Sequence, residues 1–273
     1  MKPYIYSNQR ALNLPTKSSS KPRLTWLVLL SGAFLVWFWP TKTTLEYQYD
    51  EIMKAAKTQP SVAAQAEIGN LKINIPDWSF FKDGAIWSLV NKQAQLSNRF
   101  TPDLVDSPIE HTGNSMKVAV QMSGKLEALH QAATREGVRL MLSSAYRSAN
   151  DQQAIYDSYL RSHGQAYVND YVARPGTSEH QTGLAVDISS YSSACKAQAS
   201  QCSLDFSAIS WLRNNASKFG FIQRYPSGKQ SITGVAGEAW HYRYVGTELA
   251  KLLTSSNLTL DEFVAQIAPG YAK

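Results

Sequence analysis

Residues 178–188 read SEHQTGLAVDI, and this stretch decides the fold of the region around it. Toward its end every second residue is apolar: Leu184, Val186 and Ile188. A period of two predicts a β-strand with one buried face. Asp187 should therefore project from the opposite face. His180 precedes the strand, on a turn that Gly183 helps to form because glycine tolerates backbone conformations that other residues avoid.

Residues 238–244 form a second stretch with the same period and read EAWHYRY. Its alternate positions are aromatic: Trp240, Tyr242 and Tyr244. We expect another strand here, with His241 on its polar face. Glu238 stands ahead of that strand and directly after Gly237, where a loop could aim its carboxylate past a metal ion bound by His241.

Together the two stretches carry the residue types that a catalytic zinc site needs. Two neighbouring strands could present His180, Asp187 and His241 to one ion and leave a fourth position for water. Zinc lowers the pKa of such a water to about 7, and Glu238 could take its proton and pass it to a leaving amine. Each residue alone is commonly structural, but the coincidence of all four in two ordered motifs favours a metal site.

The region from Ser123 onwards reads as alternating helices and strands. A strand with one apolar face is expected over residues 138–143. Capping and stop signals predict four helices: from Ser123 to Gly137, from Ser148 to Gly164, from Asp205 to Phe219 and onwards from Thr259. The expected fold class is α+β: a small mixed or antiparallel sheet, flanked by helices, holds the zinc site and follows a single N-terminal transmembrane helix.

The N-terminal segment predicts a membrane anchor. Residues 24–39 carry no charge and have tryptophans near both ends, although the run is shorter than the roughly 20 residues that span a bilayer comfortably. By the positive-inside rule, we expect a single pass through the cytoplasmic membrane, arranged as a cytoplasmic tail (1–23), an anchor (24–39), a juxtamembrane spacer (40–85) and an extracytoplasmic catalytic domain (86–273). The alternative is a cleaved signal peptide, but the run ends in WFWP, a poor cleavage site.

The charge of the chain is concentrated in that tail. The formal net charge is +6, and five of the positive charges precede the apolar run, with no acidic residue among them: Lys2, Arg10, Lys17, Lys21 and Arg23. The rest of the chain is close to neutral and offers no electrostatic footprint for DNA or RNA. We therefore expect no nucleic-acid partner.

The only two cysteines of the sequence are Cys195 and Cys202, in a polar stretch rich in serine and glutamine. Outside the cytoplasm such a pair is typical of a loop-closing disulfide rather than of two free thiols. Zinc ligation by this pair is disfavoured, because the spacing is not C-x-x-C and better ligands exist.

The chain resembles the D-alanyl-D-alanine carboxypeptidase family of VanY-like zinc peptidases from about Trp87 to the C-terminus. The similar segments are LVNK (89–92), TPDLV (101–105), SAYRS (144–148) and the two stretches quoted above. Two positions depart from the family pattern: Ala145 stands where glycine is frequent, and Ala239 where proline is common. Both departures concern fine geometry rather than chemical groups.

The resemblance implies a role for each candidate site residue. The implied zinc ligands are His180, Asp187 and His241, and the implied catalytic base is Glu238. The residues implied to bind the C-terminal end of the substrate are Arg147, Gln152 and Ser178. The implied activity is removal of the terminal D-alanine from peptidoglycan stem peptides, with Zn²⁺ as cofactor.

Arg147 fits an exopeptidase on chemical grounds, because a guanidinium can bind a free carboxylate through two hydrogen bonds. The alternative for Arg147 is a structural ion pair. Three other functions stay open: an L,D-carboxypeptidase, a cell-wall endopeptidase and a non-catalytic wall-binding module. Glu238 argues against the binding module, which has no use for a proton-transfer base.

Overall fold

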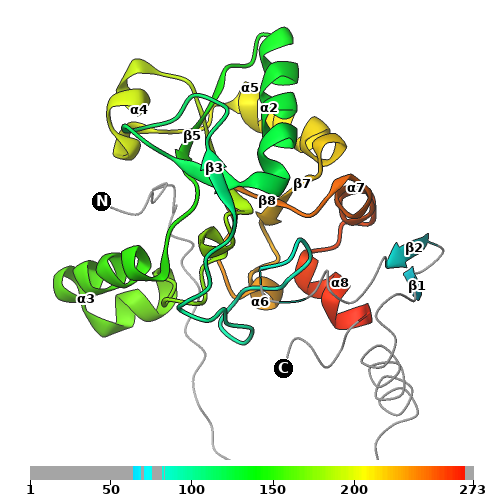
Figure 1. Ribbon diagram of the computed structural model, residues 1–273, viewed down its shortest axis with the longest axis horizontal. Coiled ribbons are helices and arrows are strands. Elements are labelled where there is room, and N and C mark those ends of the chain that lie inside the picture. The colour runs from blue at the N-terminus through cyan, green and yellow to red at the C-terminus, as the bar shows by residue number, and fades with distance from the viewer. Residues whose placement is uncertain (1–63, 69–70, 76–81, 83, 268–273) are drawn as a thin grey trace, which may run out of the picture.

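The structure is a computed structural model that describes residues 64–68, 71–75, 82 and 84–267 (Figure 1). The predicted tail and anchor, residues 1–39, lie outside these residues. Within the part of the chain that is described, no helix is both long and apolar enough to cross a bilayer. The predicted spacer includes an antiparallel hairpin of β1 (Ala64–Ile68) and β2 (Leu71–Ile75).

The centre of the fold is a four-stranded antiparallel sheet in the order β5-β6-β8-β7. Its strands are β5 (Leu140–Ser144), β6 (Ala185–Ser190), β8 (Glu238–Tyr244) and β7 (Phe221–Tyr225). The predicted strands around Asp187 and His241 are therefore adjacent in space, although they are far apart in the sequence. β3 (Leu104–Asp106) and β4 (Lys117–Ala119) form a separate two-stranded antiparallel sheet, which is joined to the central one by the hydrogen bond from the N–H of Ala119 to the carbonyl of Gly183.

The prediction that residues 138–143 bury only one face was wrong. Leu140 and Leu142 join the main core, and Met141 between them is also fully buried. Met141 packs against Cys195 and Cys202. The segment that contains the cysteines covers the second face of β5, so the strand is apolar on both sides.

Helix α2 (Val120–Arg135) buries a stripe with helical spacing against the sheet: Met122, Leu126, Leu129 and Ala133. It begins three residues before the predicted start at Ser123. The reason is tertiary, because the N–H of Val120 donates to the carbonyl of Asp103. A backbone group from another segment thus replaces the side-chain cap that a sequence pattern would reveal.

Three of the other predicted helices begin at the expected caps. Ser148 accepts from the N–H of Asp151 at 3.1 Å and starts α3 (Ala149–Tyr171), which is interrupted at Gly164 by a φ of 81°. Asp205 caps α5 (Phe206–Asn215), and the 3-10 turn η4 (Ala216–Phe219) follows. Thr259 and Glu262 form a reciprocal capping box at the start of α8 (Leu260–Ile267).

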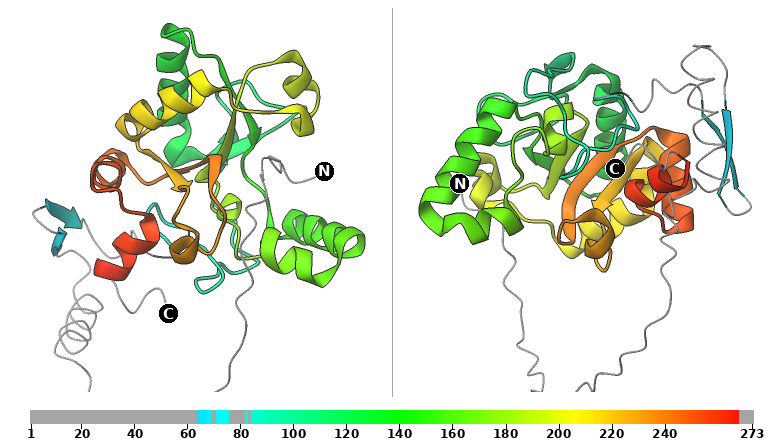
Figure 2. Two further views of the ribbon diagram at one scale, coloured as in Figure 1. Left: turned by 180° about the vertical axis from the view of Figure 1, so that it is seen from behind. Right: turned by 90° about the horizontal axis from the view of Figure 1, so that it is seen from below.

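The strands β1 to β4 and β7 were not predicted, nor were these helices and 3-10 turns: η2 (Glu179–Thr182), α4 (Ser193–Ala197), η3 (Ala199–Gln201), α6 (Gln230–Thr233) and α7 (Thr247–Ser256). Helix α3 lies at one end of the molecule and α7 and α8 at the other, as the front and rear views both show (Figures 1 and 2). A second core cluster joins α7 and α8 to Trp87 and Leu89. The segment before β3 is thus packed into the domain.

Candidate metal centre

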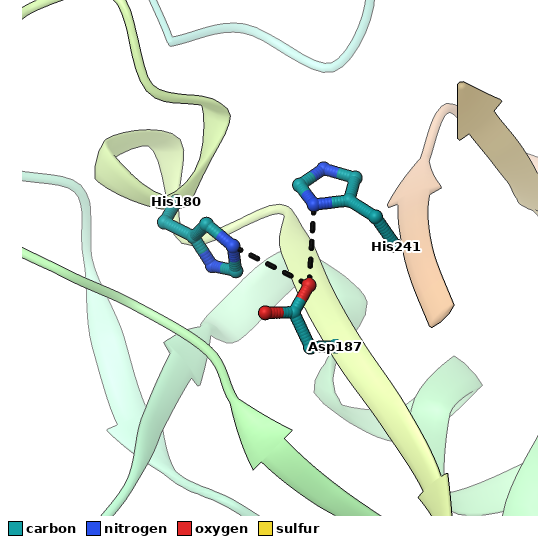
Figure 3. Close-up of side chains that lie close together, drawn as sticks. All are labelled: His180, Asp187 and His241. Carbon is teal, nitrogen blue, oxygen red and sulfur yellow. Dashed lines mark ion pairs between the residues drawn. The ribbon is translucent and has the colours of Figure 1, made fainter. Parts of the chain in front are cut away.

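Asp187 and His241 are direct cross-strand partners of β6 and β8. Their side chains leave the same face of the sheet, and Nδ1 of His241 lies 3.2 Å from Oδ1 of Asp187 (Figure 3). Each strand fixes the backbone of one residue, so the pair is held by the sheet itself rather than by a loop. The predicted alternation placed both residues correctly.

His180 completes the group from η2 (Glu179–Thr182), a short 3-10 turn that Gly183 ends with a φ of 68°. A side chain at position 183 would also crowd the backbone N of Ala119, at 3.1 Å. Nε2 of His180 lies 3.5 Å from Oδ1 of Asp187, and one ligand atom from each of the three residues lies within 4.8 Å of the others (Figure 3). The three predicted ligands therefore meet at one point.

In each of the two imidazoles, one nitrogen forms a hydrogen bond and the other faces Asp187. Nδ1 of His180 donates to the carbonyl of Ala145 at 2.7 Å, so Nε2 keeps its lone pair toward Asp187. Nε2 of His241 lies 3.4 Å from Oε2 of Glu179, so the lone pair of Nδ1 faces Asp187. Both tautomers suit metal binding.

The electrostatics of the group fit a divalent cation. Oδ1 of Asp187 is buried and has no hydrogen-bond partner among the residues that the structure describes, which is unusual for a carboxylate oxygen unless it ligates an ion. Burial would raise the pKa of Asp187, but the neighbouring imidazoles hold it well below its usual range. Two nitrogens and one carboxylate oxygen form the donor set of a catalytic zinc site with an open position.

The surroundings shift the pKa values of the two histidines in opposite directions. Burial lowers the pKa of His180, so it is neutral at pH 7, as a ligand must be. Burial would also lower the pKa of His241, but the carboxylates of Asp187 and Glu179 raise it to about 9. In the absence of a metal, a proton on His241 therefore supplies the positive charge that these carboxylates require.

Glu238 is the first residue of β8 rather than part of a loop, which corrects the prediction. The register with β7 shifts between Gln223 and Tyr225, and this irregularity turns Glu238 toward the side of His241. Oε2 of Glu238 lies 3.7 Å from Nδ1 of His241, and 27% of the side chain is exposed. Burial raises the pKa of Glu238 to about 7, a value suited to proton transfer at neutral pH.

Arg147 lies beside the same group, and its guanidinium is held by neutral partners. It donates to Oε1 of Gln152 at 2.8 Å and to Oγ of Ser144 at 3.2 Å. The amide of Gln152 in turn donates to the carbonyl of Ala173 at 2.7 Å. Among the described residues, Arg147 makes no ion pair.

Ser178 is buried at the start of η2, and its hydroxyl forms no hydrogen bond within the described part of the chain. Its carbonyl accepts from the N–H of Gln181. The structure therefore places Ser178 two residues from His180, with a free hydroxyl.

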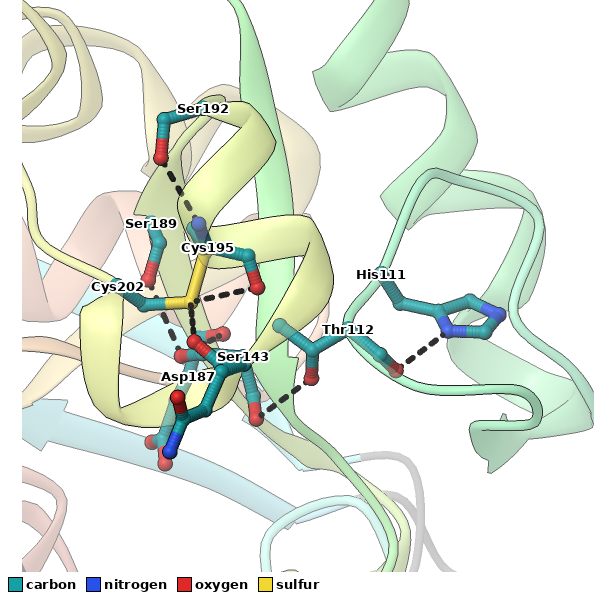
Figure 4. The surroundings of a disulfide bond; sticks show 9 residues. His111, Thr112, Ser143, Asp187, Ser189, Ser192, Cys195 and Cys202 are labelled. Atoms are coloured by element: carbon teal, nitrogen blue, oxygen red, sulfur yellow. Dashed lines mark hydrogen bonds between the residues drawn. A yellow bond between two sulfur atoms is a disulfide. The ribbon is translucent and has the colours of Figure 1, made fainter.

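A disulfide joins Cys195 and Cys202, as predicted, which excludes these residues as zinc ligands. It lies beside Ser143 and Ser189, whose hydroxyls hydrogen bond at 3.1 Å (Figure 4). Ser143 also donates to the backbone carbonyl of Asp187 at 3.3 Å. The disulfide segment therefore covers the sheet beside the strand that carries Asp187.

The sequence reasoning assigned no role to Glu179, Arg224 or Arg243, yet all three side chains are fully buried behind His241. The signal was present in the sequence. Arg224 and Arg243 each stand between bulky residues of a strand, and a charge that is buried on such a strand must be paired. Their common partner is Glu179.

Known proteins are similar to this chain in sequence and in fold. A family model described as VanY, D-alanyl-D-alanine carboxypeptidase, matches residues 115–247. The putative carboxypeptidase YodJ of Bacillus subtilis (strain 168) is 37% identical over 187 residues, which are 67% of this chain and 68% of that protein. A D-alanyl-D-alanine carboxypeptidase of Enterococcus faecalis is 32% identical over 249 residues, which are 85% of this chain and 88% of that protein.

Solved structures of similar sequence have a similar fold. The LdcB LD-carboxypeptidase superimposes with a TM-score of 0.61 and 32% identity, over 75% of this chain and 94% of that one. A vancomycin-resistance D,D-pentapeptidase VanY in complex with Zn(II) gives a TM-score of 0.55 and 35% identity, over 65% of this chain and 98% of that one. The mixed α+β fold, with its antiparallel sheets flanked by helices, is thus found in both.

Proposed function

Since this chain belongs to the VanY family of D-alanyl-D-alanine carboxypeptidases and is a zinc metallocarboxypeptidase, we propose that it removes the terminal D-alanine from peptidoglycan stem peptides. One observation carries the proposal. The three-residue ligand group lies together with a carboxylate whose pKa is near neutrality and with an arginine that makes no ion pair to any described residue. These are the parts that hydrolysis at a free C-terminus requires.

The residues that would hold zinc are His180 through Nε2, Asp187 through Oδ1 and His241 through Nδ1. Zinc supplies Lewis acidity, which polarises a scissile carbonyl and makes water a better nucleophile near neutral pH. The protein supplies the geometry, because two of these residues are paired across the sheet and the third is held by a hydrogen bond to Ala145.

Glu238 is the proposed general base. Its carboxylate accepts the proton of the attacking water and then delivers it to the nitrogen of the leaving D-alanine. The position of Glu238 supports both proton transfers, because its side chain is partly exposed and its carboxylate lies 3.7 Å from Nδ1 of His241. A pKa of about 7 makes both the deprotonated and the protonated form accessible at neutral pH.

Arg147 is the proposed anchor for the substrate carboxylate. Gln152 holds its guanidinium from one side without neutralising it, so the charge remains available to an anionic ligand. The hydroxyl of Ser178 is the proposed second contact, because it has no partner within the described chain and Ser178 directly precedes the turn that carries His180. This arrangement favours exopeptidase over endopeptidase activity.

We propose that residues 24–39 anchor the protein in the cytoplasmic membrane, with the N-terminus inside and the catalytic domain outside. The support is the uncharged run and the basic tail before it. Anchoring would raise the effective concentration of the enzyme near membrane-linked or wall-linked substrates. Protease protection of the tail in intact spheroplasts, together with cleavage of the domain, tests this topology.

A second candidate function is L,D-carboxypeptidase activity on tetrapeptides. It is favoured by the similarity to the LdcB LD-carboxypeptidase over 94% of that chain. Incubation of the full-length protein in detergent with stem pentapeptide and tetrapeptide, followed by mass spectrometry, separates the two. We expect loss of one alanine from the pentapeptide. Release from the tetrapeptide alone would establish the second function in place of the first.

A further inference from the structure

A buried ion cluster lies directly behind His241 and has no part in the proposed reaction. Glu179, Arg224 and Arg243 are its centre, and all three side chains are 0% exposed. Glu179 belongs to the same turn as His180, while the two arginines come from β7 and β8. The cluster therefore connects three of the elements that build the metal centre.

The two oxygens of Glu179 have different partners. Oε1 accepts from Nε of Arg224 at 2.8 Å and from Nη1 of Arg243 at 2.9 Å. Oε2 lies 3.4 Å from Nε2 of His241. One oxygen is thus fixed by two guanidinium groups, and the other is left for the imidazole.

Both arginines are fixed at their outer ends. Arg224 makes a two-contact ion pair with Asp261 of α8, including Nη2 to Oδ1 at 3.2 Å. Nη2 of Arg243 donates to the carbonyl of Ser88 at 3.0 Å. The carboxylate of Glu179 is therefore held from α8 on one side and from the segment before β3 on the other.

The charges within the cluster balance, since Glu179 and Asp261 offset Arg224 and Arg243. Oε1 of Glu179 accepts hydrogen bonds from both guanidinium groups, at 2.8 Å and 2.9 Å, so Glu179 is a carboxylate, which can only accept hydrogen bonds. Its neighbour Nε2 of His241 must then be the donor.

We propose that Glu179 is a positioning residue for the metal ligand His241: it accepts the Nε2 proton and so turns the Nδ1 lone pair toward the zinc position. The inference rests on the proposed function, because it takes His241 to be a ligand. Glu179 is not one of the three residues that would hold zinc. Through Arg224 and Arg243 it links the orientation of the imidazole to the packing of α8 and of the segment before β3.

Glu179→Gln tests the inference, because glutamine keeps the shape and removes the charge. We expect zinc affinity, measured by competition with a chromogenic chelator, to fall by about 10- to 100-fold, the range typical of lost partners of metal ligands. The matched control is Glu262→Gln. Glu262 pairs with Lys229 at 2.9 Å and caps α8, so its loss should lower thermal stability but change zinc affinity by less than twofold.

Nitrogen-15 NMR of the zinc-loaded wild-type protein tests the same point without a variant. We expect the His241 ring to carry its proton on Nε2, with slow solvent exchange, and to show a metal-bound Nδ1. A proton on Nδ1, or zinc affinity within twofold of wild type in a folded Glu179→Gln protein, would overturn the positioning role. Failure of the wild type to bind zinc at all would instead refute the proposed function, and the positioning role with it.

Discussion

Asp187 and His241 face each other across the β6–β8 pair, with Oδ1 and Nδ1 3.2 Å apart. Their relative position is fixed by sheet register, and a one-residue slip would send one of the two side chains to the other face. Two of the three predicted ligands are therefore placed by the backbone pairing of the central sheet. Only His180 and Glu238 depend on local irregularities, a 3-10 turn and a register shift.

Glu238→Ala should separate metal binding from turnover. The three ligands remain, so we expect one zinc per chain, while kcat falls by about 10²- to 10⁴-fold because the general base is lost. Metal analysis and steady-state kinetics on the same sample check this. Full activity in the variant would rule out the role assigned to Glu238.

Arg147→Ala should weaken recognition of the C-terminal carboxylate. We expect kcat/KM to fall by about 30- to 100-fold or more, since a charge-assisted hydrogen-bonded contact contributes roughly 2–3 kcal/mol. The decisive comparison uses a free-acid peptide and its C-terminal amide. The wild type should strongly prefer the acid, whereas the variant should lose most of that preference.

Gln152→Ala should have a weaker effect on the same carboxylate site. Loss of the 2.8 Å contact leaves the guanidinium charged but less well oriented, so we expect a smaller fall in kcat/KM than for Arg147→Ala. An equal preference for acid over amide in wild type and in the Arg147→Ala variant would remove the carboxylate site from the account.

The disulfide should stabilise the fold without serving the chemistry. Replacing Cys195 and Cys202 with alanine opens a short loop and should lower the free energy of unfolding by about 2–3 kcal/mol. Denaturant titration measures the change. Activity well below the unfolding transition should remain close to that of wild type, and loss of zinc in the folded variant would show that the disulfide also supports the site.

Asp205→Ala should make helix α5 less stable in a pH-dependent way. The backbone N–H of Ala208 donates to Asp205 at 2.8 Å and lowers its pKa. The carboxylate therefore contributes stability above its unfolded pKa of about 3.9, and this contribution is lost as pH falls through the lower folded pKa. We expect a cost of about 1 kcal/mol at pH 7 that shrinks in acid.

Asp205→Asn is the control, because asparagine caps helices well but does not titrate in this range. Its stability should stay near that of wild type at pH 7. The test is to measure the unfolding midpoints of the wild type, Asp205→Ala and Asp205→Asn from pH 7 to pH 2. A cost in Asp205→Ala that stays constant down to pH 2 would contradict the proposed linkage.

The sequence was sufficient where local signals and tertiary structure agree. The alternation around Asp187 and His241 marked the two central strands, and the caps at Ser148, Asp205 and Thr259 marked three helices. In these places the residues that determine the structure lie within one turn or one strand of each other.

The sequence was insufficient where contacts between distant segments determine the structure. Strand β7 was not recognised because buried Arg224 interrupts its apolar pattern, and that arginine is explained only by Glu179 and Asp261. The start of α2 depends on the carbonyl of Asp103. The position of Glu238 depends on the register between β7 and β8, which no local pattern reveals.

Zinc titration of chelator-treated, full-length protein tests the central claim most directly. With stem pentapeptide as substrate, alanine release should be absent in the metal-free protein and should rise linearly until one zinc is bound per chain. Release that persists without metal, or a protein that binds one zinc and releases no alanine from either pentapeptide or tetrapeptide, would contradict the assignment as a zinc carboxypeptidase of stem peptides.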